Sequence, residues 1–306
     1  MQITRGVIPS ALKVLIYGPE GIGKTTLASR FPDPVFIDTE GSTKQMDVAR
    51  LPSPESWGDI LNQVKYIANS SACKTLVIDT ADWAEMFCMK ALCGNDKSIE
   101  DFGYGKGYVM LAERFKELLD ELNKVIDAGI HVVLTAHAQM RKFEQPDEMG
   151  AYDRWELKMQ KKTAPLVKEW ADMILFCNYR THVIEKDGKK KARGGERVMY
   201  TTHHPCWDAK NRFGLPEVLP MEFDAIASVV GVPEAPQVPN ELKSLMDRDG
   251  VTDEDIRFLA VTKAWVTDTE IPLYRYKKEL IDFIVQNWEK VRELAKSETI
   301  PFEEED

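Results

Sequence analysis

The chain has 306 residues, enough to bury one large domain and a smaller one. Its formal net charge of -10 excludes a generally basic nucleic-acid coat, because the field of the whole molecule repels phosphate and contacts must come from local patches. Five irregularly spaced cysteines indicate reduced thiols, and no apolar run has signal-peptide or membrane-spanning length, so we expect a cytoplasmic protein with no membrane partner.

Residues 1–232 alternate short apolar runs with longer amphipathic segments. Runs nearly continuous in Val, Ile and Leu predict strands buried on both faces of a parallel sheet. The expected strands are residues 12–17, 34–38, 75–79, 131–135 and 173–177. The clearest helix is residues 108–129, whose apolar side chains recur at helical spacing up to a stop at Gly129. We therefore expect an α/β core with helices on both faces of a mostly parallel sheet and an edge β-hairpin at residues 182–202.

The remaining residues predict a second, smaller part of the chain. A Pro-rich linker is expected at residues 233–240, followed by a small helical domain at 241–296. Within that domain, Thr252 is the expected N-cap of one helix, and Pro272 is expected in the first turn of the next. The acidic residues 297–306 are expected to form a disordered tail.

The segment "GPEGIGKT" fits the phosphate-binding pattern G-x-x-x-x-G-K-[ST], between a predicted strand and a predicted helix. Its glycines let backbone N–H groups surround phosphates, Lys24 is expected to reach the outer phosphates of ATP, and Thr25 is expected to ligate Mg²⁺. The expected nucleotide-binding residues are Gly18, Pro19, Glu20, Gly21, Ile22, Gly23, Lys24, Thr25 and Thr26.

Carboxylates close two further predicted strands. Asp79 ends the strand at 75–79, where a P-loop fold needs an acid that holds magnesium, usually through water. Asp38 and Glu40 end the strand at 34–38, and a carboxylate on the strand next to the P-loop strand can activate an attacking water. Such a water base indicates ATP hydrolysis and argues against a small-molecule kinase, which needs none.

Taken in order, "GPEGIGKTT", "FIDTEGS", "TLVIDT", "GYGKGY", "TAHAQ" and "AKNRFGLP" resemble the RecA/RadA recombinase core, and most closely the phage-encoded annealing recombinases of the Sak type. The resemblance implies catalytic roles for six residues. Glu40 would be the base, Asp79 the magnesium-holding acid, and Lys24 the P-loop lysine that contacts the outer phosphates. His137 would replace the Gln that senses the γ-phosphate, and Lys210 and Arg212 would reach the ATP of a neighbouring subunit. It also implies a ring or filament acting beside a single-strand-binding protein. The alternatives are a strand-end His137 that caps backbone groups and a solvated pair at Lys210 and Arg212.

Two insertions, residues 93–108 and 140–170, fall where recombinases face DNA. They interleave cations with aromatic residues, a composition that suits phosphate neutralisation and base stacking on single strands. Residues 139–197 hold 14 Lys/Arg against 10 Asp/Glu, although a charged surface loop with locally packed aromatics gives the same statistics. The expected DNA-binding residues are Lys97, Tyr104, Lys106, Arg141, Lys142, Arg154, Lys158, Lys161 and Lys162.

Together these patterns predict an ATP-dependent, Mg²⁺-dependent recombinase that binds single-stranded DNA and promotes annealing or strand exchange. One alternative is a helicase-like or packaging-type motor on the same core, which would unwind or translocate directionally. The other is a nucleotide-gated regulator of a protein partner, in which charge reversals at residues 141–162 would leave activity intact.

Overall fold

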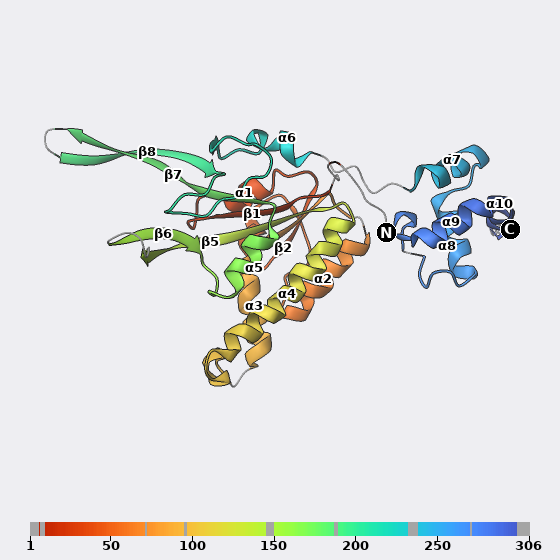
Figure 1. Cartoon of the computed structure of the whole chain (residues 1–306), viewed down its shortest axis with the longest axis horizontal. Helices are drawn as coiled ribbons and strands as arrows, with labels where there is room; N and C mark the ends of the chain where they lie inside the picture. Colours follow the sequence, from red (N-terminus) through yellow and green to blue (C-terminus); the bar gives the residue numbers. More distant parts are fainter. Residues whose placement is uncertain are drawn as a thin grey trace. The chain divides into compact units, whose positions relative to one another are not determined.

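The computed structural model describes residues 6, 10–70, 72–94, 97–144, 150–186, 189–231, 238–269 and 271–298. It divides the chain into two compact units, residues 1–233 and 234–306 (Figure 1). The strands of the first unit are β1 (Lys13–Gly18), β2 (Pro34–Asp38), β3 (Ala49–Arg50), β4 (Thr75–Asp79), β5 (His131–Glu144), β6 (Ala151–Leu157), β7 (Met173–Lys186), β8 (Lys189–Tyr200) and β9 (Val218–Pro220).

These strands form one sheet in the order β3-β2-β4-β5-β1-β7-β8-β9, with β6 paired to β5. All pairings from β3 to β7 along this order are parallel, and the pairings to β6, β8 and β9 are antiparallel. The predicted mostly parallel sheet with an edge hairpin is therefore confirmed. One expectation was wrong: β2 is not next to β1, because β4 and β5 lie between them.

Helices cover both faces of this sheet, as predicted. One face packs against α2 (Trp57–Ser70), α3 (Ala81–Cys93), α4 (Lys106–Asp127) and α5 (Thr163–Trp170), and the other against α1 (Lys24–Ala28) and α6 (Ala227–Val230), with 3-10 turns at Ser42–Gln45, Ile99–Phe102 and Phe223–Ala225. The helix α4 buries one apolar stripe and ends where predicted, since Gly129 has φ +79° and its N–H donates to the Ile126 carbonyl.

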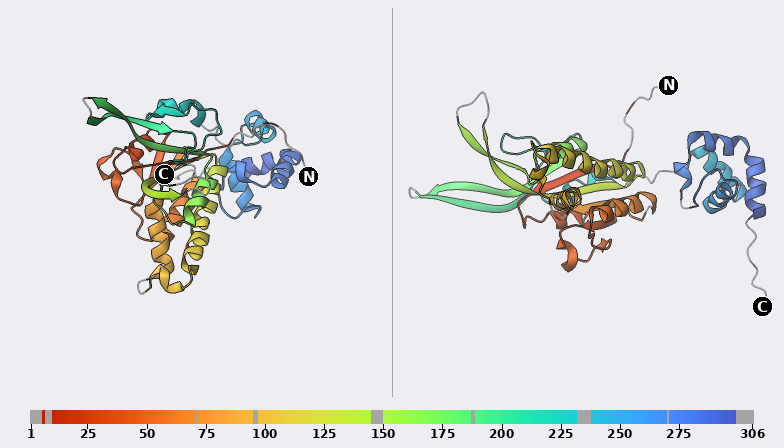
Figure 2. Two further views of the ribbon diagram at one scale, coloured as in Figure 1. Left: turned by 60° about the vertical axis from the view of Figure 1, so that its left-hand side comes forward. Right: turned by 90° about the horizontal axis from the view of Figure 1, so that it is seen from below.

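Two strands run much farther than the sequence indicates. The predicted ends were residues 135 and 177, but β5 continues to Glu144 and β7 to Lys186. Beyond the parallel sheet, each pairs antiparallel with the segment that follows it, β6 or β8, and the two hairpins project from the same end of the sheet (Figures 1 and 2). The insertion expected at residues 140–170 therefore begins in a β-hairpin and ends in α5, and residues 145–149 within it lie outside the described residues.

The second unit is helical, with α7 (Asn240–Asp249), α8 (Asp253–Thr262), a 3-10 turn at Leu273–Arg275, α9 (Lys278–Gln286) and α10 (Trp288–Glu298). Thr252 caps α8 as predicted, since its side chain accepts a hydrogen bond from the Asp255 N–H. The placement of Pro272 was wrong, because this residue precedes the 3-10 turn and the long helix expected after it is broken at Asn287. Helix α7 was not predicted, although all but its first residue lie within the predicted helical domain.

Most of the predicted linker and tail, residues 233–237 and 299–306, lies outside the described residues. Residues 297–298, assigned to the tail, instead close α10. None of the helices in the described ranges combines the length and apolar composition needed to cross a membrane.

Gly18 shows how tightly the P-loop strand packs. A Cβ at this position would lie 2.2 Å from the carbonyl oxygen of Cys177 on β7. We expect Gly18→Ala to lower the free energy of unfolding by about 1–3 kcal/mol, because the two strands must separate. Urea unfolding measures the difference. Gly58→Ala on α2, where a Cβ meets no atom closer than 3.6 Å, is the matched control, and equal losses in both variants would contradict the packing argument.

Candidate nucleotide site

The P-loop joins β1 to α1 and has the shape that phosphate binding requires. Gly21 and Gly23 have φ of +73° and +106°, and left-handed residues within such a turn direct successive N–H groups into one concavity. The Ile22 side chain is fully buried and anchors the loop. The Lys24 ammonium lies against the loop, 3.3 Å from the Gly18 carbonyl oxygen and 3.0 Å from that of Pro19.

Asp79 ends β4 with its carboxylate fully buried, and three hydroxyl groups donate to it. Thr25 donates to Oδ2 at 2.9 Å, Ser42 donates to the same oxygen at 2.6 Å, and Thr135 donates to Oδ1. The structure thus brings together the two residues expected at the magnesium site. Ser42 and Thr135 were not singled out from the sequence, since a lone hydroxyl residue carries no local signal.

The donors gathered here fit magnesium. Mg²⁺ binds oxygen ligands, commonly one or two carboxylates together with substrate phosphates. The Thr25 hydroxyl and the Asp79 carboxylate supply such oxygens beside the P-loop. Burial lowers the pKa of Lys24, and the nearby carboxylates of Asp79 and Asp82 oppose that shift. The Lys24 side chain thus has two acidic neighbours.

Glu40 is held by a loop that Asp38 organises. The Asp38 carboxylate accepts hydrogen bonds from the N–H groups of Gly41, Ser42 and Thr43 and from the Thr43 hydroxyl, at 2.6–3.1 Å. Asp38 is therefore a structural residue, and only Glu40 remains as a candidate base. Burial raises the pKa of Glu40, and Asp79 and Asp82 act in the same direction against the attraction of His137. A raised pKa makes a carboxylate a better proton acceptor near neutral pH.

His137 lies on β5 between two carboxylates. Its Nδ1 is 2.8 Å from Asp82 Oδ2, its backbone N–H donates to Asp82 Oδ1 at 3.0 Å, and its Nε2 is 3.9 Å from Glu40 Oε2. The imidazole thus faces the candidate base, and the His137 carbonyl accepts the N–H of Lys158. Asp82 was missed because an acid in the first turn of a helix looks like a solvated end residue.

The two residues expected to act on a neighbour lie far from this protomer's own P-loop. Lys210 pairs with Ile174 near the start of β7, whereas the P-loop follows the opposite end of β1. The Lys210 ammonium donates to three carbonyl groups at the end of α5, so it is not a free cation in this structure. Arg212 pairs with Asp172 at 3.2 Å, and 61% of its side chain is exposed.

The expected DNA-binding residues divide into an exposed and a buried group. The exposed ones are Lys97, Tyr104, Lys106, Lys142, Lys158, Lys161 and Lys162. Arg141 is half-buried and lies 3.7 Å from Glu156. The expectation for Arg154 was wrong: this residue is 9% exposed, pairs with Asp208 and donates to the Pro205 carbonyl, so it stabilises the base of the β5–β6 hairpin.

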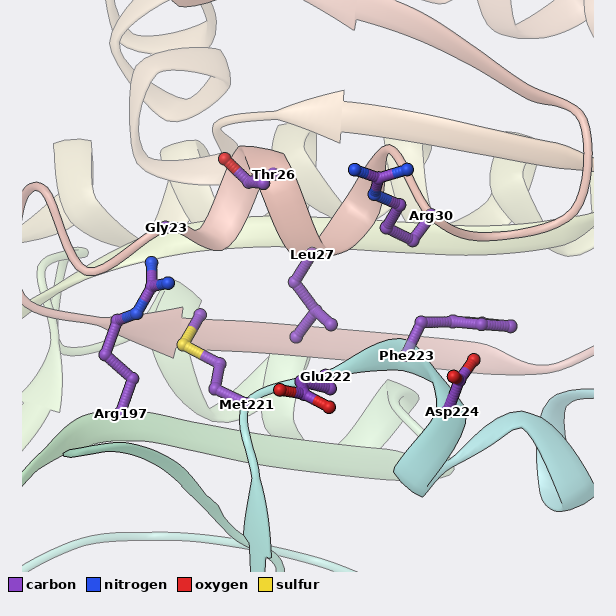
Figure 3. A pocket seen from close by; sticks show the side chains of 9 residues that line it. All are labelled: Gly23, Thr26, Leu27, Arg30, Arg197, Met221, Glu222, Phe223 and Asp224. Carbon is purple, nitrogen blue, oxygen red and sulfur yellow. The ribbon is translucent and has the colours of Figure 1, made fainter.

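A cavity of about 400 Å³ opens beside the P-loop (Figure 3). It is lined by Gly23, Thr26, Leu27, Arg30, Arg197, Met221, Glu222, Phe223 and Asp224. Arg197 donates to the Ile22 carbonyl at 3.4 Å, and the Phe223 ring packs edge-on against Phe31. Because Gly23 and Thr26 belong to the P-loop, this cavity adjoins the candidate phosphate site.

The P-loop after β1, the acid after β4 and the sheet order define a P-loop ATPase with a RecA-like α/β core. The AAA domain family AAA_24 matches residues 10–213, and the chain belongs to this family.

The proteins similar to this chain include a prophage protein and a solved structure. The SPbeta prophage-derived uncharacterized protein YorG of Bacillus subtilis (strain 168) is 25% identical over 219 residues, which cover 69% of this chain and 62% of YorG. The chain therefore spans less than two thirds of that relative. The KaiC-like protein PH0186 of Pyrococcus horikoshii OT3 matches at 14% identity with a TM-score of 0.37, over 69% of this chain and 90% of that one. With so low a score, the fold assignment rests on the strand order and the family.

The Asp38 loop predicts a pH dependence of stability. Burial acts to raise the pKa of Asp38, but its hydrogen bonds outweigh burial and hold the pKa below the ordinary 3.8. The stabilisation is therefore present above about pH 4 and is lost as the pH falls through the folded-state pKa. We expect Asp38→Asn to lower the free energy of unfolding by about 1.5–3 kcal/mol at pH 7 and by less at pH 3.

Urea unfolding at both pH values measures these differences. The exposed Asp47→Asn is the matched control and should change little at either pH. A loss in Asp38→Asn that does not shrink at pH 3 would show that the ionised carboxylate is not what organises the loop.

Proposed function

We propose that this protein is an ATP-dependent recombinase that binds single-stranded DNA and promotes annealing or strand exchange in phage-type recombination. The observation that carries the proposal is the course of β5, which brings His137 to the nucleotide site and then continues as one leg of a hairpin with exposed cations. Nucleotide and DNA would thus contact one continuous strand. The prophage origin of YorG supports the phage setting.

In the proposed reaction Glu40 accepts a proton from the attacking water, and Lys24 balances negative charge on the outer phosphates. Both side chains converge with Asp79 at the same end of the parallel sheet. Magnesium, when bound, would be held by Thr25 and Asp79 and would supply further charge neutralisation at the phosphates. The shared strand allows the two sites to affect each other, and in this proposal ATP favours the DNA-bound assembly and hydrolysis releases it.

The proposed DNA surface follows the β5–β6 hairpin and the residues just after it. Lys142, Lys158, Lys161 and Lys162 are exposed there, and the Phe143 ring is 38% exposed, so it is open to a stacked base. The rear of that ring packs against Tyr152 and Arg154, which fixes its position. Lys97, Tyr104 and Lys106 form a separate proposed contact at the junction of α3 and α4.

Arg212 supports self-assembly into a ring or filament. Arg212 lies at the opposite end of the strands from its own P-loop, so the ATP that it would contact in this proposal belongs to another copy. A contact between two different surfaces of identical subunits builds rings or filaments. In this proposal Arg212 is the residue that acts on the neighbour, and Lys210 holds its segment against α5.

The cavity beside the P-loop predicts a residue that determines nucleotide affinity. If Phe223 contacts the base, Phe223→Ala should raise the KM for ATP about tenfold with little change in kcat, because stacking on an aromatic ring contributes about 1–3 kcal/mol per base. Steady-state ATPase assays measure both constants. Phe213→Ala, which removes a 37% exposed ring that does not line the cavity, is the matched control. An unchanged KM in Phe223→Ala would show that the base of ATP does not bind against Phe223.

The decisive experiment for the proposed function is ATP hydrolysis with and without single-stranded DNA, at low and high salt. We expect stimulation by DNA that weakens as salt rises, because cations on the hairpin release counterions from the strand. Glu40→Ala should lower the rate by about 10²–10⁴-fold, the usual contribution of a general base. The triple variant Lys142→Glu, Lys161→Glu and Lys162→Glu should lose the stimulation and keep the basal rate.

Lys116→Glu, on an exposed face of α4, is the matched charge control and should be stimulated like the wild type. If DNA does not change the rate of ATP hydrolysis in the wild type or in any variant, the recombinase is excluded and a nucleotide-gated regulator of a protein partner is favoured. Directional strand unwinding driven by the same hydrolysis would instead identify a motor.

A further inference from the structure

Helix α3 carries two buried carboxylates that the proposed hydrolysis does not need. Asp82 is 6% exposed and Glu85 is 4% exposed. Three residues apart, they lie on the same face of the helix, toward its N-terminal end. The helix itself begins at Ala81, two residues after Asp79, and is capped by the Thr80 side chain. The two carboxylates are therefore rigidly connected to the magnesium acid.

Asp82 holds the outgoing leg of the β5–β6 hairpin. Its carboxylate accepts two hydrogen bonds from His137, one from the backbone N–H and one from Nδ1–H. Burial acts to raise the pKa of Asp82, but the hydrogen bonds from His137 outweigh it and keep the pKa below 3.8. Because an ionised carboxylate only accepts, Nδ1 carries a proton and Nε2 is the atom presented to Glu40.

Glu85 holds the returning leg. Its two carboxylate oxygens accept the backbone N–H of Gln160 at 3.2 and 3.0 Å, three residues after β6 ends. Burial raises the pKa of Glu85, so this carboxylate is kept in an environment that disfavours its charge. The two legs are also joined directly, since the Lys158 N–H donates to the His137 carbonyl at 2.8 Å. Helix α3 therefore forms hydrogen bonds with both legs of the hairpin where they leave the sheet.

We propose that Asp82 and Glu85 are positioning residues that couple the β5–β6 hairpin to Glu40 in the nucleotide site. A force on the hairpin reaches His137 along β5, and His137 is the side chain that faces Glu40. With both legs fixed to α3, the hairpin moves together with Asp79 and His137. With the returning leg free, the hairpin bends at its root and the nucleotide site no longer responds. The proposal rests on the proposed function only in naming single-stranded DNA as the hairpin's ligand.

Glu85 offers the cleaner test, because it contacts neither nucleotide nor Glu40. Glu85→Leu removes both acceptors and leaves the Gln160 N–H unpaired, a loss that removal of a buried charge partly offsets, so circular dichroism and urea unfolding are used to verify that the variant is folded. Glu85→Gln keeps one oxygen that accepts the Gln160 N–H and should restore the wild-type behaviour. Glu113→Leu, on an exposed position of α4, is the matched control. In ATPase assays we expect the basal rate of Glu85→Leu to stay within about twofold of the wild-type rate. The stimulation of that rate by DNA should be at least tenfold smaller than in the wild type.

A second measurement does not depend on DNA. Coupling between two sites is reciprocal, so ATP should change the hydrogen-exchange rates of amides in residues 139–144 and 151–157. With a non-hydrolysable ATP analogue in place of ATP, which prevents turnover and keeps Glu40, we expect the nucleotide to slow exchange in the hairpin. Glu85→Leu should reduce that effect at least fivefold, while Glu85→Gln and Glu113→Leu should preserve it.

The outcomes separate the two proposals. A hairpin that responds to ATP through Glu85, in a protein whose hydrolysis ignores DNA, supports the coupling and overturns only the DNA ligand. A hairpin that does not respond to ATP, or that responds equally in Glu85→Leu, overturns the coupling whatever DNA does. Loss of the response in Glu85→Gln as well as in Glu85→Leu also overturns it, because the hydrogen bond would then not be the cause.

Discussion

The structure depends above all on the buried carboxylate of Asp79. A buried charge is costly unless hydrogen bonds satisfy it, and here three hydroxyl groups do so. Those hydroxyls come from the start of α1, the segment after β2, and β5. The Asp79 side chain on β4 therefore connects, through hydrogen bonds, the segment after β2 and strand β5 to the P-loop helix α1. The nucleotide site forms where these chain segments are drawn together.

The second organising feature is that β5 and β7, the two strands that flank β1, do not stop at the nucleotide site. Each continues into an antiparallel hairpin (Figure 2). Both hairpins therefore project from the carboxyl ends of the parallel strands, the same end of the sheet that carries the nucleotide site. The root of the β5–β6 hairpin is stiffened twice, by the Arg154–Asp208 ion pair on one side and by Asp82 and Glu85 on the other. In the proposed coupling, these contacts would transmit motion of the hairpin to α3 and β5.

Several functional assignments failed where a side chain's partner is distant in sequence. Arg154 and Lys210 look like solvated cations in a charged segment, yet Arg154 pairs 54 residues away and Lys210 caps a helix about 40 residues upstream. Asp82 and Glu85 were missed for the same reason, since an acid on a short helix looks solvent-exposed until β5 and the segment after β6 are packed against it. Asp38 was recognised as a strand-end acid, but only its loop shows that it organises Glu40.

The sequence by itself determined the P-loop, the strands at 34–38 and 75–79, the long helix α4 and the α/β class, because glycine positions, apolar runs and helical periodicity act between neighbouring residues. It did not determine the place of β2 in the sheet, the extension of β5 and β7, or the meeting of Glu40, His137 and Asp82. Those features are decided by tertiary structure, because strand order and hydrogen bonds to buried carboxylates join residues that are distant in sequence. Asp82 and His137, for example, are 55 residues apart, and no local pattern records which segment will be the partner.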